Sequence, residues 1–246
     1  MKSKELFSIL DSVDSTNNYA MAMLHEGLAI HGQAWFSALQ TEGKGQREKK
    51  WYSRPGENIA LSIALLPGSL FQGKQFLFNA FISLQCYNFL KPFIGDNIKI
   101  KWPNDIYWRD RKAGGILIEN KMKARKWEWA VVGIGLNINQ ESFPPELPNP
   151  VSLKQITGST ENILSIAMNL HSSILSAFEA LDPAKLEKLM NEYNEALYKK
   201  NEAVKLRKEN IVFSTTVKSV NPFGQLLTQD AIERKFDFGE VEWVIG

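Results

Sequence analysis

Apolar and polar positions along the first half of the chain follow two different periods. Good N-cap residues at Asp14–Asn17 precede an apolar stretch that stops near Gly27, which predicts a first helix. Residues 74–93 are apolar apart from a few amides and a serine, which predicts a buried helix packed on a sheet. Strand-like runs lie at residues 33–39, 58–66, 98–102, 113–119 and 127–134, with a basic hairpin expected at 120–126.

Past residue 150 the pattern changes to amphipathic helices and then to short strands. After Lys200, alternating runs separated by turn residues are typical of a small β-barrel. We therefore expect an α+β domain over residues 1–199 and a β domain over residues 200–246. The helices are predicted at 161–181 and 183–197, and the strands at 203–206, 212–220, 225–228, 232–238 and 241–245.

Composition excludes several classes of protein. The 246 residues carry 29 basic and 27 acidic side chains, so no strong overall field draws the chain to nucleic acid, and any phosphate site must be local. No run of about 18 apolar residues and no signal-like N-terminus occurs, so we expect a cytoplasmic protein without a membrane span. The single cysteine, Cys86, cannot form an internal disulfide and is expected to be inert packing.

One lysine-bearing strand stands out as a candidate for chemistry. Pro103 ends this strand, and Asn104 and Asp105 favour a polar turn that can bind a nucleotide or a metal ion. A lysine just before such a turn can hold a phosphate or an acyl oxygen, although two structural lysines on a solvated strand would give the same pattern. Alternation puts Ile98, Ile100 and Trp102 on one face of the strand and Lys99 and Lys101 on the other.

Three glycine-containing segments could also approach a ligand. Residues 40–51 combine glycines with basic side chains, which suits a flap over a phosphate or carboxylate, or else a solvated surface loop. Their spacing matches neither a Walker loop nor the dinucleotide fingerprint. Residues 112–117 bring a lysine and two glycines to the start of a strand, as a plain hairpin would. Residues 133–139 end a strand with glycines and asparagines that could hold ribose, phosphate or hydrated magnesium, or cap a bend.

Taken together, these segments resemble the biotin protein ligase family. The motifs at residues 14–17, 40–51, 101–105, 112–117 and 133–137 occur in the family's order and at its separations, and the similarity extends from about Ile9 to the end. The resemblance implies a central mixed sheet flanked by helices, as in class II synthetase-like catalytic domains, followed by a small SH3-like β domain. It also implies that ATP and biotin, with Mg²⁺, give biotinyl-5'-adenylate, from which biotin passes to a lysine of a biotin carboxyl carrier protein.

The resemblance assigns roles to individual residues. Lys101 would stabilise the charge that develops between the biotin carboxylate and the α-phosphate, and Asp105 would act as general base or orienting group. Asn137 and Asp105 would contact magnesium. Biotin would be held by Ser15, Thr16, Asn17, Gln40, Gly43, Lys44, Gly45, Gln46, Lys101, Gly114 and Gly115, and ATP by Arg47, Trp51, Asn104, Lys112 and Asn137.

The chain departs from the family in the basic loop, where Gln46 replaces an arginine of the usual Gly-Arg-Gly-Arg pattern. Because this removes a permanent charge, we expect the adenylate to be held less tightly than in relatives with the arginine.

The resemblance leaves some properties open and excludes others. Since the motifs begin within the first residues, we expect a monofunctional ligase without specific DNA binding, either monomeric or homodimeric. One alternative is a lipoate or octanoate ligase or transferase of the same superfamily. Its Arg-Arg-x-x-Gly-Gly-Gly segment and His-Asp pair are missing from the sequence. Another is a biotin- or nucleotide-binding regulator that has lost turnover.

Overall fold

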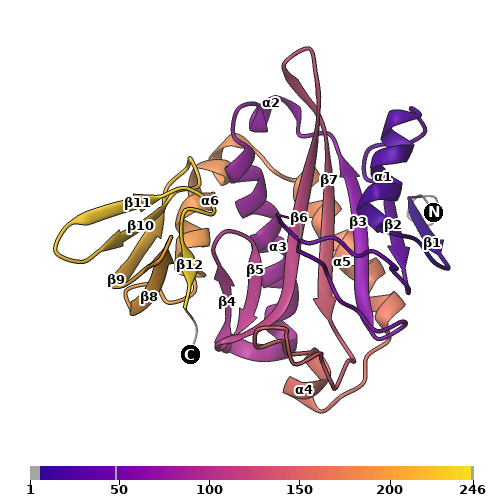
Figure 1. Cartoon of the computed structure of the whole chain (residues 1–246). Helices are drawn as coiled ribbons and strands as arrows, with labels where there is room; N and C mark the ends of the chain where they lie inside the picture. Colours follow the sequence, from indigo (N-terminus) through magenta and orange to yellow (C-terminus); the bar gives the residue numbers. More distant parts are fainter. Residues whose placement is uncertain (1–5, 48, 245–246) are drawn as a thin grey trace.

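The computed structural model describes residues 6–47 and 49–244, and a seven-stranded sheet forms its centre (Figure 1). The strand order is β1-β2-β3-β7-β6-β5-β4. The pair β1 and β2 is parallel and the other neighbours are antiparallel, so the predicted mixed sheet is confirmed. The strands are β1 (Phe7–Leu10), β2 (Ala34–Ser37), β3 (Asn58–Leu65), β4 (Ile98–Lys101), β5 (Asp105–Trp108), β6 (Arg111–Lys123) and β7 (Lys126–Asn137).

Helices lie over most of one face of this sheet and over a smaller part of the other. The helix α3, predicted from its apolar run, contacts α5 and α6 and lies over the large core. On the opposite face α1 packs on β2, β3 and β7 over a small core around Trp35. The rest of that face, along β4 to β7, has no helix over it in Figure 1. The helices are α1 (Thr16–His25), α2 (Gly68–Phe71), α3 (Gln75–Ile94), α4 (Leu153–Thr157), α5 (Ile163–Glu179) and α6 (Pro183–Glu195), with a 3₁₀ turn η1 (Gly95–Asn97).

Local sequence explains most of these elements. Helix α1 begins after Ser15 and ends before Gly27, whose φ of 71° favours glycine, and α6 is capped by Asp182. Strand β3 is buried at every position because it lies between two covered faces. Cys86 is fully buried in α3, and burial raises the pKa of its thiol to about 12, which fits inert packing.

Several sequence predictions are corrected by the structure. Asp105 opens strand β5 and does not merely close a turn, and the basic stretch 120–126 belongs mostly to the strands β6 and β7. Only Ala124 and Arg125 make the turn of that hairpin, with positive φ angles of 46° and 65°. Strand β1 and the short helices α2 and α4 were not predicted, because segments of four or five residues show too few periods to be recognised.

A second, five-stranded antiparallel sheet follows α6, as predicted for the C-terminal region. It contacts the first sheet's turns, since the Trp102 indole donates to the Gly224 carbonyl at 2.9 Å. The domain boundary at residues 199 and 200 and the SH3-like topology stay predictions, and Ile245 of the last predicted strand lies outside the described residues. The strands are β8 (Ala203–Lys208), β9 (Ile211–Val220), β10 (Leu226–Gln229), β11 (Glu233–Phe236) and β12 (Glu242–Trp243), in the order β11-β10-β9-β8-β12.

Among residues 6–47 and 49–244, no helix is both long and apolar enough to cross a membrane.

Candidate active site

A cavity of about 550 Å³ opens on the part of the sheet that α1 leaves uncovered. This volume lies in the usual range of a small-molecule site. Its walls come from five parts of the chain that are distant in sequence. They are the start of α1, the loop 40–52, strands β4 to β7 with the turn 102–104, the proline-rich segment 143–150, and the end of the C-terminal sheet at 238–243.

One end of the cavity is a network of neutral hydrogen-bonding groups. Gln40 Oε1 accepts from the Thr16 backbone N–H at 2.8 Å and lies 3.1 Å from the Thr16 hydroxyl. Ser62 Oγ lies 2.8 Å from the Thr16 hydroxyl and 2.6 Å from Asn17 Oδ1. Ser15, Thr16, Asn17 and Ser62 are all almost fully buried. The helix start and the loop residue predicted for biotin are therefore brought together here.

On its other side, Asn17 is held by hydrogen bonds to strand β6, and Gly133 on strand β7 leaves room for it. Its amide nitrogen donates to Glu119 Oε2 at 2.8 Å and to the Leu117 carbonyl at 3.3 Å. A Cβ at Gly133 would lie 2.8 Å from Asn17 Cγ and closer still to its oxygen. Gly133 thus makes room for Asn17. Sequence reasoning missed Ser62 and Glu119, although a serine inside the apolar run of β3 was a usable signal.

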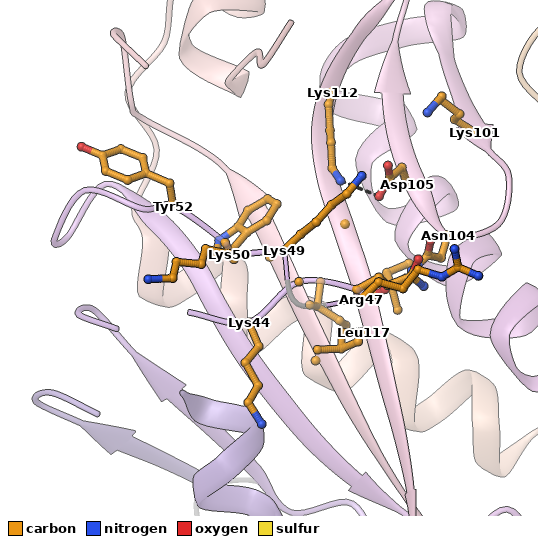
Figure 2. Close-up of a pocket in the computed structure, with 18 of the residues that line it drawn as sticks. Lys44, Arg47, Lys49, Lys50, Tyr52, Lys101, Asn104, Asp105, Lys112 and Leu117 are labelled. Atoms are coloured by element: carbon orange, nitrogen blue, oxygen red, sulfur yellow. Dashed lines mark hydrogen bonds and ion pairs between the residues drawn. The ribbon is translucent and has the colours of Figure 1, made fainter. Parts of the chain in front are cut away.

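The middle of the cavity carries several lysines close to the Asp105 carboxylate. Lys112 Nζ forms an ion pair with Asp105 Oδ1 at 2.6 Å, and Asp105 is the register partner of Lys101 on β4. Figure 2 shows this ion pair with Lys101 on the neighbouring strand and with Lys49 pointing toward the pair. Burial is the main cause that lowers the pKa of the Lys101 ammonium to about 8. The side chains predicted for catalysis do lie in one place.

The basic loop bridges the cavity to the C-terminal sheet. The Arg47 guanidinium donates to the carbonyls of Phe238 at 2.6 Å and Gly239 at 3.2 Å, and lies 4.6 Å from the Phe238 ring centroid. Lys44 reaches from the same loop to within 3.9 Å of Glu119. Gln46 and Gly45 also line the cavity. Arg47, predicted for ATP, is thus engaged by main-chain acceptors of the second sheet.

Trp51 and two asparagines complete the wall. The Trp51 indole lies on Gly135, where a Cβ would be 2.6 Å from the ring atom Cζ2, and its buried N–H has no acceptor within the described part of the chain. Asn104 donates to the Ile116 carbonyl, and Asn137 donates to the carbonyls of residues 112 and 151 at 3.2 Å each. Both amide groups therefore tie strands and loops together at the cavity.

Two residues predicted to hold biotin do not line the cavity. A Cβ at Gly43 would lie 2.9 Å from Gln40 Nε2, and one at Gly114 would lie 2.8 Å from the Gly135 carbonyl oxygen. These glycines are explained by close packing, whereas Gly115 does line the cavity. Lining residues that the sequence analysis did not identify include Tyr107, Phe143, Leu147, Phe238, Glu242 and Trp243.

The described residues offer few ligands for a magnesium ion. No group of three or more His, Cys, Asp or Glu side chains among them could hold a metal ion. Asp105 offers one carboxylate, and Asn137 lines the same cavity. Magnesium in nucleotide sites usually has one or two protein carboxylates and takes its other ligands from phosphates and water. These residues therefore suit an ion that is mostly held by a bound nucleotide.

The chain is similar in sequence to known proteins. Residues 9–137 match the model of the biotin/lipoate A/B protein ligase family. The bifunctional ligase/repressor BirA of Escherichia coli is 33% identical over 133 residues, which are 53% of this chain and 40% of that protein. The biotin–[acetyl-CoA-carboxylase] ligase of Paracoccus denitrificans is 34% identical over 158 residues, 61% of this chain and 63% of that protein. The chain thus spans less than two thirds of the length of these curated relatives.

Solved structures share the fold over nearly the whole chain. The biotin protein ligase from Aquifex aeolicus, in complex with biotin and ATP, has a TM-score of 0.77 at 24% identity. The match covers 98% of this chain and 99% of that one. The biotin protein ligase from Leishmania major, in complex with biotin, has a TM-score of 0.67 at 19% identity and covers 94% of this chain and 98% of that one.

Proposed function

The chain belongs to the biotin/lipoate A/B protein ligase family, and we propose that within this family it is an ATP-dependent biotin protein ligase. It would activate biotin as biotinyl-5'-AMP and transfer the biotinyl group to a lysine of a biotin carboxyl carrier protein. The observation that carries this proposal is one cavity with a neutral hydrogen-bonding end beside a cationic middle. Such a site suits an uncharged ureido ring next to a carboxylate and phosphates.

The neutral end is proposed to bind the ureido ring of biotin. Ser15, Thr16, Asn17 and Gln40 carry donors and acceptors at this end, and all four line the cavity. A buried polar ligand gains specificity when each of its polar atoms finds a partner, because an unpaired buried group costs roughly 1–3 kcal/mol. The loop residues Lys44, Gly45 and Gln46, supported by Gly43, would close over the bound biotin.

In the first half-reaction a biotin carboxylate oxygen would attack the α-phosphorus of ATP. A new O–P bond forms, the P–O bond to pyrophosphate breaks, and pyrophosphate leaves with magnesium. Lys101 would stabilise the negative charge that grows in this step. Asp105 and Asn137 would contribute to the magnesium site when the nucleotide is bound. The residues proposed to position ATP are Arg47, Trp51, Asn104, Lys112 and Asn137, all of which line the cavity.

In the second half-reaction the acceptor lysine amine would attack the carbonyl carbon of the mixed anhydride. An amide bond forms, the C–O bond to AMP breaks, and the amine gives up a proton. Asp105 is the proposed base or orienting group, supported by its place in the cavity, and its ion pair with Lys112 would hold the carboxylate in position for the orienting role.

Biotin-dependent exchange of labelled pyrophosphate into ATP tests the proposal. We expect exchange with biotin and none with lipoate or octanoate in parallel assays. Exchange with lipoate or octanoate alone would assign the chain to the other branch of its family. Exchange with none of them would favour a binding protein without turnover, whereas transfer of biotin to a purified carrier domain would exclude that alternative.

Replacing Gln46 by arginine is expected to slow the release of biotinyl-adenylate. Gln46 lines the cavity from the basic loop, and a guanidinium there would add a charge-assisted hydrogen bond to a phosphate oxygen. The expected change is about fivefold, equivalent to about 1 kcal/mol. Release is measured by chasing labelled adenylate from the preloaded enzyme, with Thr41→Arg as a control, since Thr41 is an exposed residue of the same loop that does not line the cavity. Equal release rates for the wild type and Gln46→Arg would contradict the proposed role.

The rate of adenylation is expected to fall as the pH rises through about 8. Burial, with Lys112 and Lys49 nearby, lowers the pKa of the Lys101 ammonium to about 8, while Asp105 opposes this shift. A lysine with a lowered pKa is charged below that value and neutral above it, so the active form is lost on the alkaline side. The measurement is kcat/KM for biotin in pyrophosphate exchange, because the pH dependence of this ratio reports the pKa values of groups in the free enzyme. A Lys101→Arg variant, charged throughout, should not show this decline.

A further inference from the structure

Trp243 brings the edge of the C-terminal sheet into the candidate active site. It lies on β12, where it pairs with Leu206 of β8, and the next residue donates its N–H to the Lys205 carbonyl at 2.9 Å. The Trp243 side chain lines the cavity. Its indole N–H is buried, and residues 6–47 and 49–244 offer it no acceptor. A side chain of the second sheet is therefore part of the wall around the proposed catalytic lysine.

The Lys101 ammonium lies between two aromatic rings. Its nitrogen is 5.1 Å from the centroid of Tyr107 and 5.5 Å from that of Trp243. Within the described residues, Lys101 has no carboxylate within 4.0 Å. The neighbouring Asp105 forms its ion pair with Lys112 instead. Attraction between a cation and an aromatic face is strongest where water is excluded, as it largely is here. The rings thus hold the charge without neutralising it.

The two rings are held in place by a third. Tyr198 lies 5.2 Å from Tyr107 and 5.6 Å from Trp243, centroid to centroid, at tilted angles of 47° and 53°. Its hydroxyl donates to Asp110 Oδ1 at 2.6 Å, which fixes the ring from behind. Two rings, from β5 and β12, therefore lie near the Lys101 ammonium, and Tyr198, from the segment after α6, packs on both of them. Rigid supports of this kind are what keep a functional group in its productive geometry.

We propose that Trp243 is a positioning residue for the adenylation step, which holds the Lys101 ammonium at the point where carboxylate and α-phosphate meet. This inference rests on the proposed ligase function. A lysine side chain has four rotatable bonds, and without the Trp243 ring its ammonium could turn toward solvent. Misplacement of a charge by about 1 Å is enough to lose much of its effect on the transition state. The C-terminal sheet then completes the active site as well as covering the first domain.

The test compares Trp243→Phe, Trp243→Leu and Trp243→Ala in the full-length chain. We expect Trp243→Ala to lower kcat of biotin-dependent pyrophosphate exchange about tenfold with a smaller change in KM. Desolvation is the largest cause of the lowered pKa of Lys101, so access of water should outweigh the lost contact with the ring and move the alkaline decline to higher pH. Trp243→Phe keeps an aromatic face and should recover most of the rate, whereas leucine, which has no such face, should not.

A control variant separates positioning from stability. Phe213 packs on Phe236 in the same C-terminal sheet at 5.9 Å but does not line the cavity. Phe213→Ala should lower the melting temperature and leave both kcat and the alkaline decline unchanged at temperatures where the variant is folded. If Trp243→Ala fails to fold, the phenylalanine and leucine variants decide the question.

The outcomes distinguish the inference from the function on which it rests. Equal kcat and equal pH profiles for phenylalanine, leucine and wild-type enzymes would overturn the role of Trp243 while leaving the ligase proposal intact. A wild-type enzyme without biotin-dependent exchange would instead overturn the proposed function. If Phe213→Ala loses as much kcat as Trp243→Ala does, the second sheet contributes only to stability and Trp243 is not a positioning residue.

Discussion

Lys101→Ala is expected to lower the rate of biotin-dependent pyrophosphate exchange by about 10²- to 10³-fold. The side chain is largely buried, it lines the cavity, and no carboxylate of the described residues lies within 4.0 Å to neutralise it. A fixed charge in a site that excludes water contributes far more than one in solution, and its removal raises the barrier by roughly 3–4 kcal/mol. The effect should appear mainly in kcat, because the charge acts as the carboxylate attacks phosphorus.

Lys99→Ala is the matched control for this prediction. Lys99 lies two residues earlier on β4 with its side chain on the same side of the strand, but it does not line the cavity. We expect the exchange rate of the Lys99→Ala enzyme to stay within about twofold of the wild type. Exchange is measured at saturating biotin and ATP near pH 7, where Lys101 is charged. Equal losses in the two variants, or a Lys101→Ala enzyme with near-normal kcat, would return Lys101 to a structural role.

Gly133→Ala is expected to weaken biotin binding roughly 10- to 100-fold, or about 1–3 kcal/mol. The backbone at Gly133 does not have a positive φ, so the cost does not come from strain of the main chain. It comes from overlap of the new methyl group with the Asn17 amide. Asn17 would then lose its hydrogen bonds to Ser62 and Glu119, and the neutral end of the cavity would lose its shape. Calorimetric titration with biotin measures the change.

A double-mutant cycle identifies the clash as the cause. Asn17→Ala removes the amide that the new methyl group would meet, so adding Gly133→Ala to it should cost little further stability. We expect the single glycine variant to lower the free energy of unfolding by about 1–3 kcal/mol and the two changes to be clearly non-additive. Additive losses would mean that Gly133 is needed for another reason than contact with Asn17.

Local patterns were enough to predict the elements that carry the main motifs. Alternation on β4 correctly separated the buried Ile98 and Ile100 from the two lysines, and capping residues correctly located the starts of α1 and α6. Both signals depend on neighbours within a few residues, which a single sequence contains. The choice between Lys99 and Lys101 came from family resemblance, because alternation gives both the same face.

The parts of the site that escaped prediction depend on contacts between distant segments. Trp243 reaches Lys101 from a strand more than a hundred residues later, and nothing in its local sequence indicates that partner. Gly43 and Gly114 show a limit of glycine patterns, because a glycine that allows ligand approach and one that allows close packing look the same in sequence. Strand β5 was hidden because its first residue, Asp105, has a strong preference for turns.

The contact between Arg47 and the turn at residues 238 and 239 has a consequence for comparing related sequences. The guanidinium binds main-chain oxygens, so these hydrogen bonds do not depend on which side chain stands at 238, although the Phe238 ring adds a cation–π contact. Gly239 is different, because a Cβ there would occupy the space of the guanidinium itself. A side chain at 239 should therefore be found only where Arg47 is absent, whereas loss of Arg47 alone leaves Gly239 constrained by its φ of 84°.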